Sequence, residues 1–409
     1  MLRTLRPVLV CLLVALPAVV LRVSGPDPSP LIALVVFGAG VVAASFVLAW
    51  AAEAAEVDIS GGLAIAILAV IAVLPEYAVD LFFAFRAGSD PTYVQYAAAN
   101  MTGSNRLLLG LGWSAVVLLS VFLASRRSGR RVTEIVLDPE HRLELGFLAI
   151  ASLVAFVIPV TGQISLGIGV IMLGLFVFYL VRVAGSPHDA EPDLVGPAAR
   201  IGALSAVQRR TVVIAMFVVS AVVIFSCAEP FADALLGSGQ LLGVDQFLLV
   251  QWLAPLASEA PEFIVAILFA VRGKASAAIG LLISAKVNQW TLLVGSLPVA
   301  YLVGGGNGTL VLDARQVEEV VLTACQTVLG IAVLLALRFP RWAAVALLAL
   351  FAVQFAVPGT HGRLIISAVY LLLAVVAIVH HRAYVVDTLT APFRRRVEQP
   401  QPERELVHS

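Results

Sequence analysis

Two stretches of the sequence decide the fold, and each places carboxylates beside a proline inside an apolar segment. The first reads Ile71-Ala72-Val73-Leu74-Pro75-Glu76-Tyr77-Ala78-Val79-Asp80, and the second reads Ala257-Ser258-Glu259-Ala260-Pro261-Glu262. Proline removes one hydrogen bond from a helix and loosens the turn before it. In lipid, such a break persists only where protein or a water-filled cavity satisfies the freed carbonyl groups. The two stretches therefore predict interrupted membrane helices.

The carboxylates in these stretches are spaced so that each pair shares one helix face. Glu76 and Asp80 are four residues apart, and Glu259 and Glu262 are three apart. A charge at the centre of a bilayer costs about 2.5–3.5 kcal/mol on the insertion scale. Together with the hydroxyl of Ser258, such oxygen ligands suit Na⁺ or Ca²⁺. The alternative is that the glutamates cap or brace helices at the lipid interface. Their recurrence at matching places favours a cation site or proton binding.

The overall composition confines the protein to a membrane. Of 409 residues, 60% are hydrophobic and only 13% are charged, so a soluble domain could not hide the apolar surface. The formal net charge of zero argues against a nucleic-acid partner. Cys11, Cys227 and Cys325 lie in apolar runs without metal or disulfide spacing. Because the sequence shows no ATP motif, redox site or nucleophile–base pair, we expect no enzyme and no cofactor. The expected partners are membrane lipid and small inorganic cations.

Apolar stretches long enough to cross a bilayer recur along the chain. We place twelve of them at about residues 6–23, 30–52, 61–86, 92–124, 144–159, 163–183, 210–236, 246–271, 276–303, 317–337, 340–357 and 363–382. The first follows Arg3 and Arg6, so a cleaved signal peptide is an alternative. Its apolar run lacks a clean small-x-small cleavage site, which favours a retained helix.

The distribution of basic residues predicts how these segments are oriented. The loops at 125–143, 184–210 and 272–275 and the tail after 382 hold most of the basic residues. In the loops on the other side, Arg315 is the only basic residue, and Arg86 and Arg363 lie at the edges of these loops. By the positive-inside rule, this is a multi-pass protein of the cell membrane with both termini in the cytoplasm.

A polar linker at 184–209 divides the chain into two halves, 30–183 and 210–357. The segment 61–86 then runs outward and the segment 246–271 runs inward, so the halves have opposite orientations. Inverted repeats of this kind, with a site at their interface, are typical of secondary transporters. Residues 1–29 form an N-terminal hydrophobic helix or signal-like segment, and residues 358–409 form a further helix with a basic tail.

Two other groups of acidic residues lie outside these stretches. Glu53, Glu56 and Asp58 fall in a predicted cytoplasmic loop, where water would solvate them. Glu229 and Asp233 lie towards the outer end of 210–236 and would guide cations inward.

Each proline–glutamate stretch is followed by a polar patch. The first patch is Asn100-Met101-Thr102-Gly103-Ser104-Asn105, which offers amide and hydroxyl oxygens together with small residues that permit close helix approach. For Thr102 and Ser104 the alternative is ordinary interhelical packing. The equivalent second patch runs from Gly280 to Trp290 and contains Lys286 and Asn288.

A Pro-Glu helix followed about 24 residues later by Asn-x-x-Gly-Ser-Asn resembles the alpha repeat of the sodium/calcium exchanger (cation/Ca²⁺ antiporter) superfamily. The usual pattern is Gly-Thr-Ser-Leu-Pro-Glu, then Gly-Asn-x-x-Gly-Ser-Asn. The resemblance covers about 30–125 and 210–305 and identifies a divergent bacterial-type member. It implies an all-α integral membrane protein, an inverted-repeat helical bundle with ten core helices, and two glutamates that bind Ca²⁺ and Na⁺ at its centre. The segments 6–23 and 363–382 would be one extra helix at each end.

The sequence also departs from the pattern of the resembled family. The serines three residues before each glutamate, which resemble Na⁺ ligands in the family, are replaced by Val73 and Glu259. The second Gly-Ser-Asn triplet is Ser284-Ala285-Lys286. Unlike the permanently charged Arg106 beside Asn105, a buried lysine can lose its proton. Lys286 would neutralise Glu259 or act as a counter-ion that tunes proton release from Glu259 or Glu262. Snorkelling of Lys286 to the interface is the alternative.

The sequence thus predicts a secondary-active antiporter that moves Ca²⁺ or Na⁺ against Na⁺ or H⁺ by alternating access. The predicted cation-site residues are Glu76, Asp80, Asn100, Ser104, Asn105, Ser258, Glu259, Glu262, Lys286 and Asn288. Three alternatives stay open: a proton-coupled Na⁺ antiporter with Lys286 in the site, a degenerate membrane protein that transports nothing, and an intramembrane enzyme.

Overall fold

The computed structural model describes residues 2–26, 28–58, 71, 73–184, 194–357 and 359–394. The first half of the predicted segment 61–86 therefore lies outside the described residues, as do residues 185–193 of the linker. The helical elements are α1 (Leu2–Ser24), α2 (Pro30–Ala55), α4 (Leu74–Ser89), η1 (Pro91–Tyr93), α5 (Val94–Leu107), η2 (Leu108–Trp113), α6 (Ser114–Ser128), α7 (His141–Ala155), α8 (Val157–Thr161), α9 (Leu166–Ala184), α10 (Gly196–Gly202), α11 (Ala206–Leu242), α12 (Gln246–Ser258), α13 (Ala260–Val271), α14 (Ala275–Asn288), η3 (Gln289–Leu293), α15 (Val294–Val303), α16 (Ala314–Leu334), α17 (Arg341–Ala356), α18 (Thr360–His380), η4 (Arg382–Tyr384) and α19 (Val385–Thr390).

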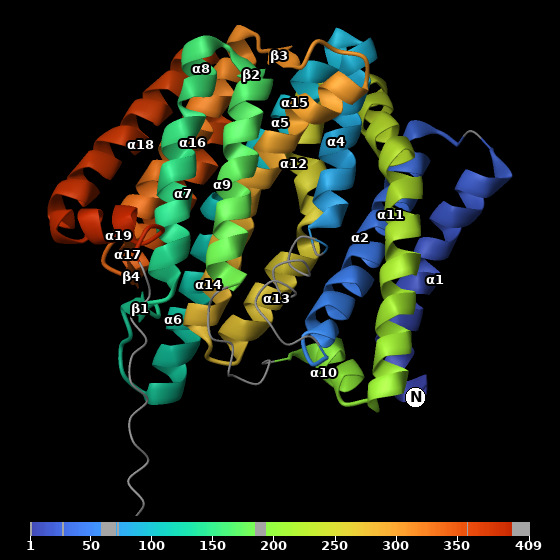
Figure 1. Ribbon diagram of the computed structural model, residues 1–409, viewed down its shortest axis with the longest axis horizontal. Helices are drawn as coiled ribbons and strands as arrows, with labels where there is room; N and C mark the ends of the chain where they lie inside the picture. The colour runs from blue at the N-terminus through green and yellow to red at the C-terminus, as the bar shows by residue number, and fades with distance from the viewer. Residues whose placement is uncertain are drawn as a thin grey trace, which may run out of the picture.

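These helices form a bundle of roughly antiparallel spans (Figure 1). Among the described residues, nine helices are long and apolar enough to cross a membrane, and the bent pair α12–α13 makes a tenth. The shorter apolar helix α17 and the described part of the third segment, α4, complete the predicted set. The helical membrane bundle expected from hydropathy is therefore confirmed. Its helices run past the predicted ends, most of all α11, which has 37 residues.

Two short antiparallel sheets reveal how the halves are related. Strand β1 (Glu134–Val136) pairs with β4 (Arg338–Pro340), and β2 (Gln163–Ser165) pairs with β3 (Thr309–Val311). β1 and β3 follow the third span of their respective halves, and β2 and β4 follow the fourth. Exchanging the halves therefore converts one sheet into the other. The sheets lie at opposite ends of the bundle, as an inverted repeat requires (Figure 1). They are a small addition to the all-α architecture.

Breaks in the helices occur at matching places in the two halves. The chain bends by 54° between α12 and α13, at Glu259 and just before Pro261. Pro75 likewise lies in the first turn of α4. The following span of each half contains a π-helical turn, η2 in the first half and η3 in the second. Such turns interrupt the regular helical hydrogen bonds and are frequent at functional sites. The proline interruption is confirmed at Pro261, and the π-turns were not predicted.

Small residues bring the two halves into close contact. A Cβ atom added to Gly103 of α5 would overlap the backbone carbonyl of Gln251 in α12. Similarly, a Cβ at Gly304 would overlap the backbone of Phe85 in α4. Close backbone approach through small residues is how membrane helices pack tightly, because lipid offers no hydrophobic drive between them. These contacts bring the α5 and α12–α13 segments together at the centre of the bundle.

The loops rich in basic residues share one end of the bundle. There Arg127 donates to the carbonyl of Val271, and the amide of Asp138 donates to Ser276 Oγ at 2.9 Å. Arg209 pairs with Asp58 at the same end. The N-terminus and α10 also lie at this end (Figure 1). At the opposite end, Arg22 pairs with Glu229 at 2.6 Å and Arg315 pairs with Asp245 at 2.6 Å.

Candidate cation-binding site

Two glutamates from opposite halves meet at one serine in the centre of the bundle. Ser104 Oγ lies 2.6 Å from Glu76 Oε1 and also contacts Glu259 Oε1 closely. Helix α4 supplies Glu76 from its first turn, α5 supplies Ser104, and Glu259 is the residue at which α12 ends and α13 begins. All three side chains are buried. The proline-induced breaks therefore present two carboxylates to the same hydroxyl.

A glutamine that was not predicted as a site residue completes this group. Gln289 Nε2 donates to Glu259 Oε1 at 2.9 Å and to Ser104 Oγ at 3.1 Å. Gln289 opens the π-turn η3, directly after Asn288. The signal was present in the sequence, because the residue is an amide in the second polar patch. Its contact with Glu259 links residues 30 positions apart, which the sequence pattern does not reveal.

A hydroxyl group between two carboxylates restricts their protonation. Serine has one proton to donate and two lone pairs that accept. Ser104 can therefore donate to Glu76 or to Glu259, but not to both at once. The other carboxyl group forms a hydrogen bond to Ser104 only if it carries a proton of its own. Both contacts of Ser104 can be hydrogen bonds at the same time only when one of the two carboxyl groups is protonated.

Several acceptor oxygens around this group have no donor. Glu259 Oε2, Glu262 Oε2 and Gln289 Oε1 are buried without a hydrogen-bond partner in the described part of the chain. Buried acceptors without partners are costly, because they have lost water and gained nothing in return. A hard cation such as Ca²⁺ binds through oxygen atoms of this kind. Glu259 and Glu262 therefore each offer an acceptor oxygen of the kind that such a cation binds.

A cavity of about 300 Å³ connects these glutamates to one end of the bundle. Its inner wall includes Glu76, Glu259 and Glu262, and its other end includes Glu53 and Glu56 of the α2 terminus. The expectation that Glu53 is a loop residue was wrong, whereas Glu56 lies in the turn directly after α2, as predicted. Helix α2 continues to Ala55, so its last turn carries Glu53 into the cavity wall. Asp58 lies beyond the helix and pairs with Arg209.

At the opposite end, packed side chains close the bundle above the site. Phe83 lies against Tyr93 and Tyr96, with ring centroids 6.4 and 5.9 Å apart. The hydroxyl of Tyr96 donates to Gln246 Oε1 at 2.7 Å, which joins α5 to α12. The described site therefore communicates with the end that carries the basic loops. Glu229, predicted to guide cations at the other end, is held by Arg22 of α1.

Asp80 and Asn100 form a second polar pair further along α4 and α5. They lie next to each other, and neither side chain is exposed. Among the described residues, no group lies in hydrogen-bonding geometry with the carboxylate oxygens of Asp80 or with the amide oxygen and nitrogen of Asn100. Asp80 is one helical turn from Glu76, as its spacing predicted. The pair extends the polar path from the central glutamates towards the closed end.

Lys286 lies in the other half but binds the first polar patch. Its Nζ donates to the backbone carbonyl of Asn105 at 2.8 Å and to Asn105 Oδ1 at 3.1 Å. No ion pair joins Lys286 to Glu259 or Glu262 within the described chain, although its charge acts on Glu259 and Glu76 over a longer distance. Lys286 is completely buried, so it does not snorkel to an interface. Its ammonium group therefore lies near the carboxylates without forming an ion pair with Glu259 or Glu262.

The two remaining predicted ligands, Ser258 and Asn288, lie at the edge of the site. Ser258 lines the cavity, but its hydroxyl donates to the carbonyl of Ala254 in its own helix at 3.2 Å. Asn288 is buried, and its backbone carbonyl accepts a hydrogen bond from the Tyr77 hydroxyl at 3.2 Å. These contacts fix the helices around the carboxylates.

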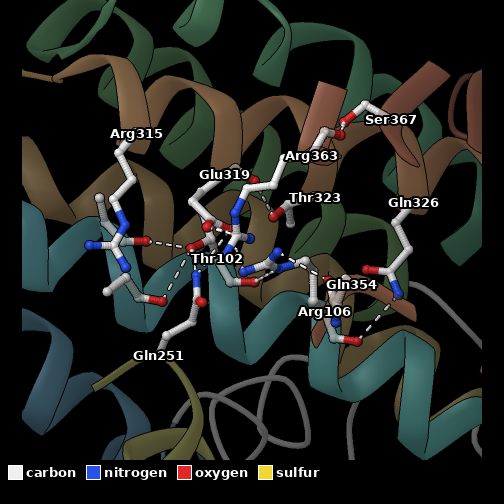
Figure 2. A network of polar contacts seen from close by, with 12 residues as sticks. Thr102, Arg106, Gln251, Arg315, Glu319, Thr323, Gln326, Gln354, Arg363 and Ser367 are labelled. Carbon is white, nitrogen blue, oxygen red and sulfur yellow. Dashed lines mark hydrogen bonds and ion pairs between the residues drawn. The ribbon is translucent and has the colours of Figure 1, made fainter. Parts of the chain in front are cut away.

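Behind α5 lies a separate buried network of charges, shown in Figure 2. Glu319 of α16 accepts from Arg106 at 2.5 Å and from Arg363 of α18. Gln251 donates to Glu319 Oε2 at 3.1 Å, and Gln354 accepts from Arg106 at 3.2 Å. The sequence singles out Arg106 but not Glu319, because the two arginines that pair with Glu319 are more than 200 residues apart in the chain. The network holds the added helix α18 against the core.

The fold and the sequence both match known cation exchangers. The sequence profile described as sodium/calcium exchanger protein matches residues 29–185 and 212–358. No curated protein gives a significant match. Among solved structures, the H⁺/Ca²⁺ exchanger CAX is 40% identical with a TM-score of 0.89, covering 96% of this chain and 98% of that one.

Two more distant structures share the fold. Native YfkE is 18% identical with a TM-score of 0.62, covering 89% of this chain and 100% of that one. The sodium-calcium exchanger NCX_Mj, soaked with 100 mM Na⁺ and 10 mM Sr²⁺, is 17% identical with a TM-score of 0.51, covering 81% and 99%. The matched profile spans more than half of the sequence, and the identity to CAX extends over nearly all of it. The chain belongs to the sodium/calcium exchanger family.

Proposed function

We propose that this protein is a Ca²⁺/H⁺ antiporter, in which Glu76, Glu259 and Glu262 bind Ca²⁺ or protons in alternation. The observation that carries the proposal is the placement of Ser104 between Glu76 and Glu259. When both contacts are hydrogen bonds, one of the two carboxyl groups carries a proton in the absence of a bound cation. A divalent cation at the same oxygens displaces that proton, because both need the same lone pairs. Binding of one ion then requires release of the other.

The residues that differ from the family pattern also favour protons over Na⁺ as the coupling ion. The positions of the family's Na⁺-ligand serines are Val73, which offers no oxygen, and Glu259, which offers a carboxylate. A site that loses hydroxyl ligands and gains a titratable group is better suited to a divalent cation and protons. The 40% identity to an exchanger of H⁺ and Ca²⁺ supports the same assignment.

The cavity supports a direction of access. It joins the carboxylates to the end that carries Arg126, Arg127 and Arg130, which the positive-inside rule assigns to the cytoplasm. Both termini would be cytoplasmic, and the structure would represent the state open to the inside. Transport requires a second state in which the packing of Phe83, Tyr93 and Tyr96 opens and the cavity at Glu53 closes.

Flux into reconstituted vesicles tests the proposal. Vesicles with an acidic lumen and no Na⁺ should take up Ca²⁺, and Glu76→Gln and Glu259→Gln should each abolish the uptake. Glu140→Gln, which changes an exposed loop residue by the same chemistry, should leave it intact. Uptake that requires luminal Na⁺ instead of a pH gradient would replace H⁺ by Na⁺ as the coupling ion. Ca²⁺ uptake by Glu76→Gln at the wild-type rate would refute the site.

One observation supports a second candidate function. In its protonated form Lys286 brings a positive charge close to the carboxylates, and that charge opposes a divalent cation more strongly than a monovalent one. Proton-coupled Na⁺ antiport would follow if this charge outweighs the carboxylates. Na⁺ pulses applied to acid-loaded vesicles without Ca²⁺ would then raise the luminal pH. A protein that transports nothing would respond to neither gradient.

A further inference from the structure

A groove of about 730 Å³ lies between α6 and α17, at the end of the bundle with the basic loops. Four arginines line it, and they come from two regions more than 200 residues apart in the sequence: Arg126, Arg130, Arg131 and Arg341. No carboxylate among the described residues lines the groove. All four side chains are exposed, and none forms an ion pair within the described residues. The groove therefore concentrates positive charge that the rest of the described chain leaves uncompensated.

Backbone structure, not chance proximity, assembles the four arginines. Gly129 adopts a left-handed conformation with φ of 64° and ends α6, which returns the chain towards the groove. The strand pair β1–β4 then fixes the start of α17 beside this turn. The amide of Arg341 donates to the carbonyl of Thr133 at 2.8 Å, next to the paired residues Glu134 and Pro340. Glu134, which is paired with Pro340 beside this turn, forms its ion pair with Arg338 at 2.9 Å and not with the groove arginines.

The wall of the groove that faces the spans is apolar. It is formed by Leu118 and Phe122 of α6 and by Val345 of α17. Phe122 is 53% exposed and Val345 is 49% exposed. Because α6 and α17 belong to the membrane bundle, these side chains face lipid. The part of the groove within the bilayer is therefore apolar, and the part at the membrane surface is cationic.

The geometry points to a binding site for one anionic phospholipid in this groove. The phosphate would accept hydrogen bonds from the four guanidinium groups, which match phosphate oxygens in pairs. One acyl chain would lie along Leu118, Phe122 and Val345. Basic pockets between membrane helices are known to take such headgroups. Basic residues that merely follow the positive-inside rule would be spread along their loops, whereas these converge on one apolar channel. The site is independent of the carboxylates at Glu76 and Glu259.

Native mass spectrometry of the full-length protein in detergent tests the site. After addition of phosphatidylglycerol, one lipid should remain bound, while phosphatidylcholine with the same acyl chains should be lost. Arg131→Gln with Arg341→Gln should weaken retention of phosphatidylglycerol at least tenfold. The control pair Arg3→Gln with Arg6→Gln removes two exposed charges from α1, at the same end but outside the groove, and should change retention less than twofold.

A second variant separates lipid from a simple anion. Val345→Trp fills the apolar channel without changing charge, so it should weaken phosphatidylglycerol but not inorganic phosphate. Equal retention of phosphatidylcholine would overturn the proposal. So would an equal loss in the Arg3/Arg6 control, which would show only diffuse surface charge. Competition by inorganic phosphate at the affinity of the lipid would also overturn it, because the acyl chain would then contribute nothing. Thermal unfolding of each variant identifies any that fail to fold.

Discussion

Lys286 Nζ lies 2.8 Å from the backbone carbonyl oxygen of Asn105, in the polar patch of the opposite half. The lysine therefore serves both halves at once: it ties α14 to α5, and its charge acts on the nearby Glu76 and Glu259 without pairing with them. Its two roles can be separated by substitution, because arginine keeps the charge and methionine removes it.

Lys286→Met should increase the apparent affinity for Ca²⁺ by about three- to tenfold, because the positive charge that acts on Glu76 and Glu259 no longer repels the cation. Concentration dependence of Ca²⁺ uptake measures this change. Lys286→Arg should stay near wild type in affinity if it folds. An unchanged Ca²⁺ affinity and unchanged pH profile in a folded Lys286→Met protein would contradict an electrostatic role for this residue.

Ser104→Ala should lower Ca²⁺ transport by about ten- to a hundredfold, since hydrogen bonds to charged groups contribute about 1.5–3 kcal/mol. The substitution removes the hydroxyl that contacts both Glu76 and Glu259, while Gln289 still contacts Glu259. Ser114→Ala is the matched control, because Ser114 is also completely buried and its hydroxyl has no partner in the described structure. Equal effects of the two substitutions on transport would mean that Ser104 acts only through packing.

Glu319→Gln should destabilise the protein by about 3–5 kcal/mol, because it leaves Arg106 and Arg363 buried without a counter-charge. Denaturant or thermal unfolding in detergent measures the loss. Glu318→Gln is the control on the adjacent residue, which is buried but forms no ion pair in the described chain. Combining Glu319→Gln with Arg363→Gln should recover part of the stability, since one uncompensated charge is removed. No recovery in the double variant would argue against charge balance as the cause.

Gly103→Ala should destabilise the protein by more than about 2 kcal/mol, because the added Cβ overlaps the backbone carbonyl of Gln251. Helices α5 and α12 must separate to admit it, which also displaces Ser104. By contrast, Gly174→Ala meets nothing within 4 Å and lies in helix α9, so it should stabilise slightly through helix propensity. Unfolding temperatures of the two variants should therefore move in opposite directions. A Gly103→Ala protein as stable as wild type would contradict the close packing.

Asp58 should make stability depend on pH in strongly acidic solution. Hydrogen bonds from Arg209, and then from Arg210, lower the pKa of Asp58 from 3.8 to about 2. Because the folded pKa lies below the unfolded one, the contribution is complete above pH 3.8 and is lost as pH falls through about 2. Asp58→Asn should remove this part of the pH dependence. Identical acid unfolding profiles for the variant and the wild type would show that the ion pair contributes nothing.

The sequence predicts the fold and the candidate carboxylates because both depend on local properties. A run of apolar residues partitions into lipid whatever its neighbours are, and Pro261 lacks its amide proton in every context. Spacing of four residues placed Asp80 on the same side of α4 as Glu76. Gln289 and Glu53 were missed for the opposite reason. Gln289 reaches Glu259 through the packing of its span against the α12–α13 break, and Glu53 reaches the cavity because α2 continues beyond its apolar run.

The sequence by itself determined that the protein is a membrane bundle of two opposed halves with acidic, proline-broken helices at its centre. Hydropathy, charge placement and the missing amide of proline act within one segment, so no partner is needed to infer their effects. Only the tertiary structure decided that Ser104 lies between Glu76 and Glu259, that Lys286 binds Asn105, and that Glu319 holds two arginines. Ser104 and Glu259 are 155 positions apart in the chain, and their contact depends on how helices of the two halves rotate and pack against each other. Close approach at Gly103, where a side chain would collide with α12, is the physical reason that this packing exists.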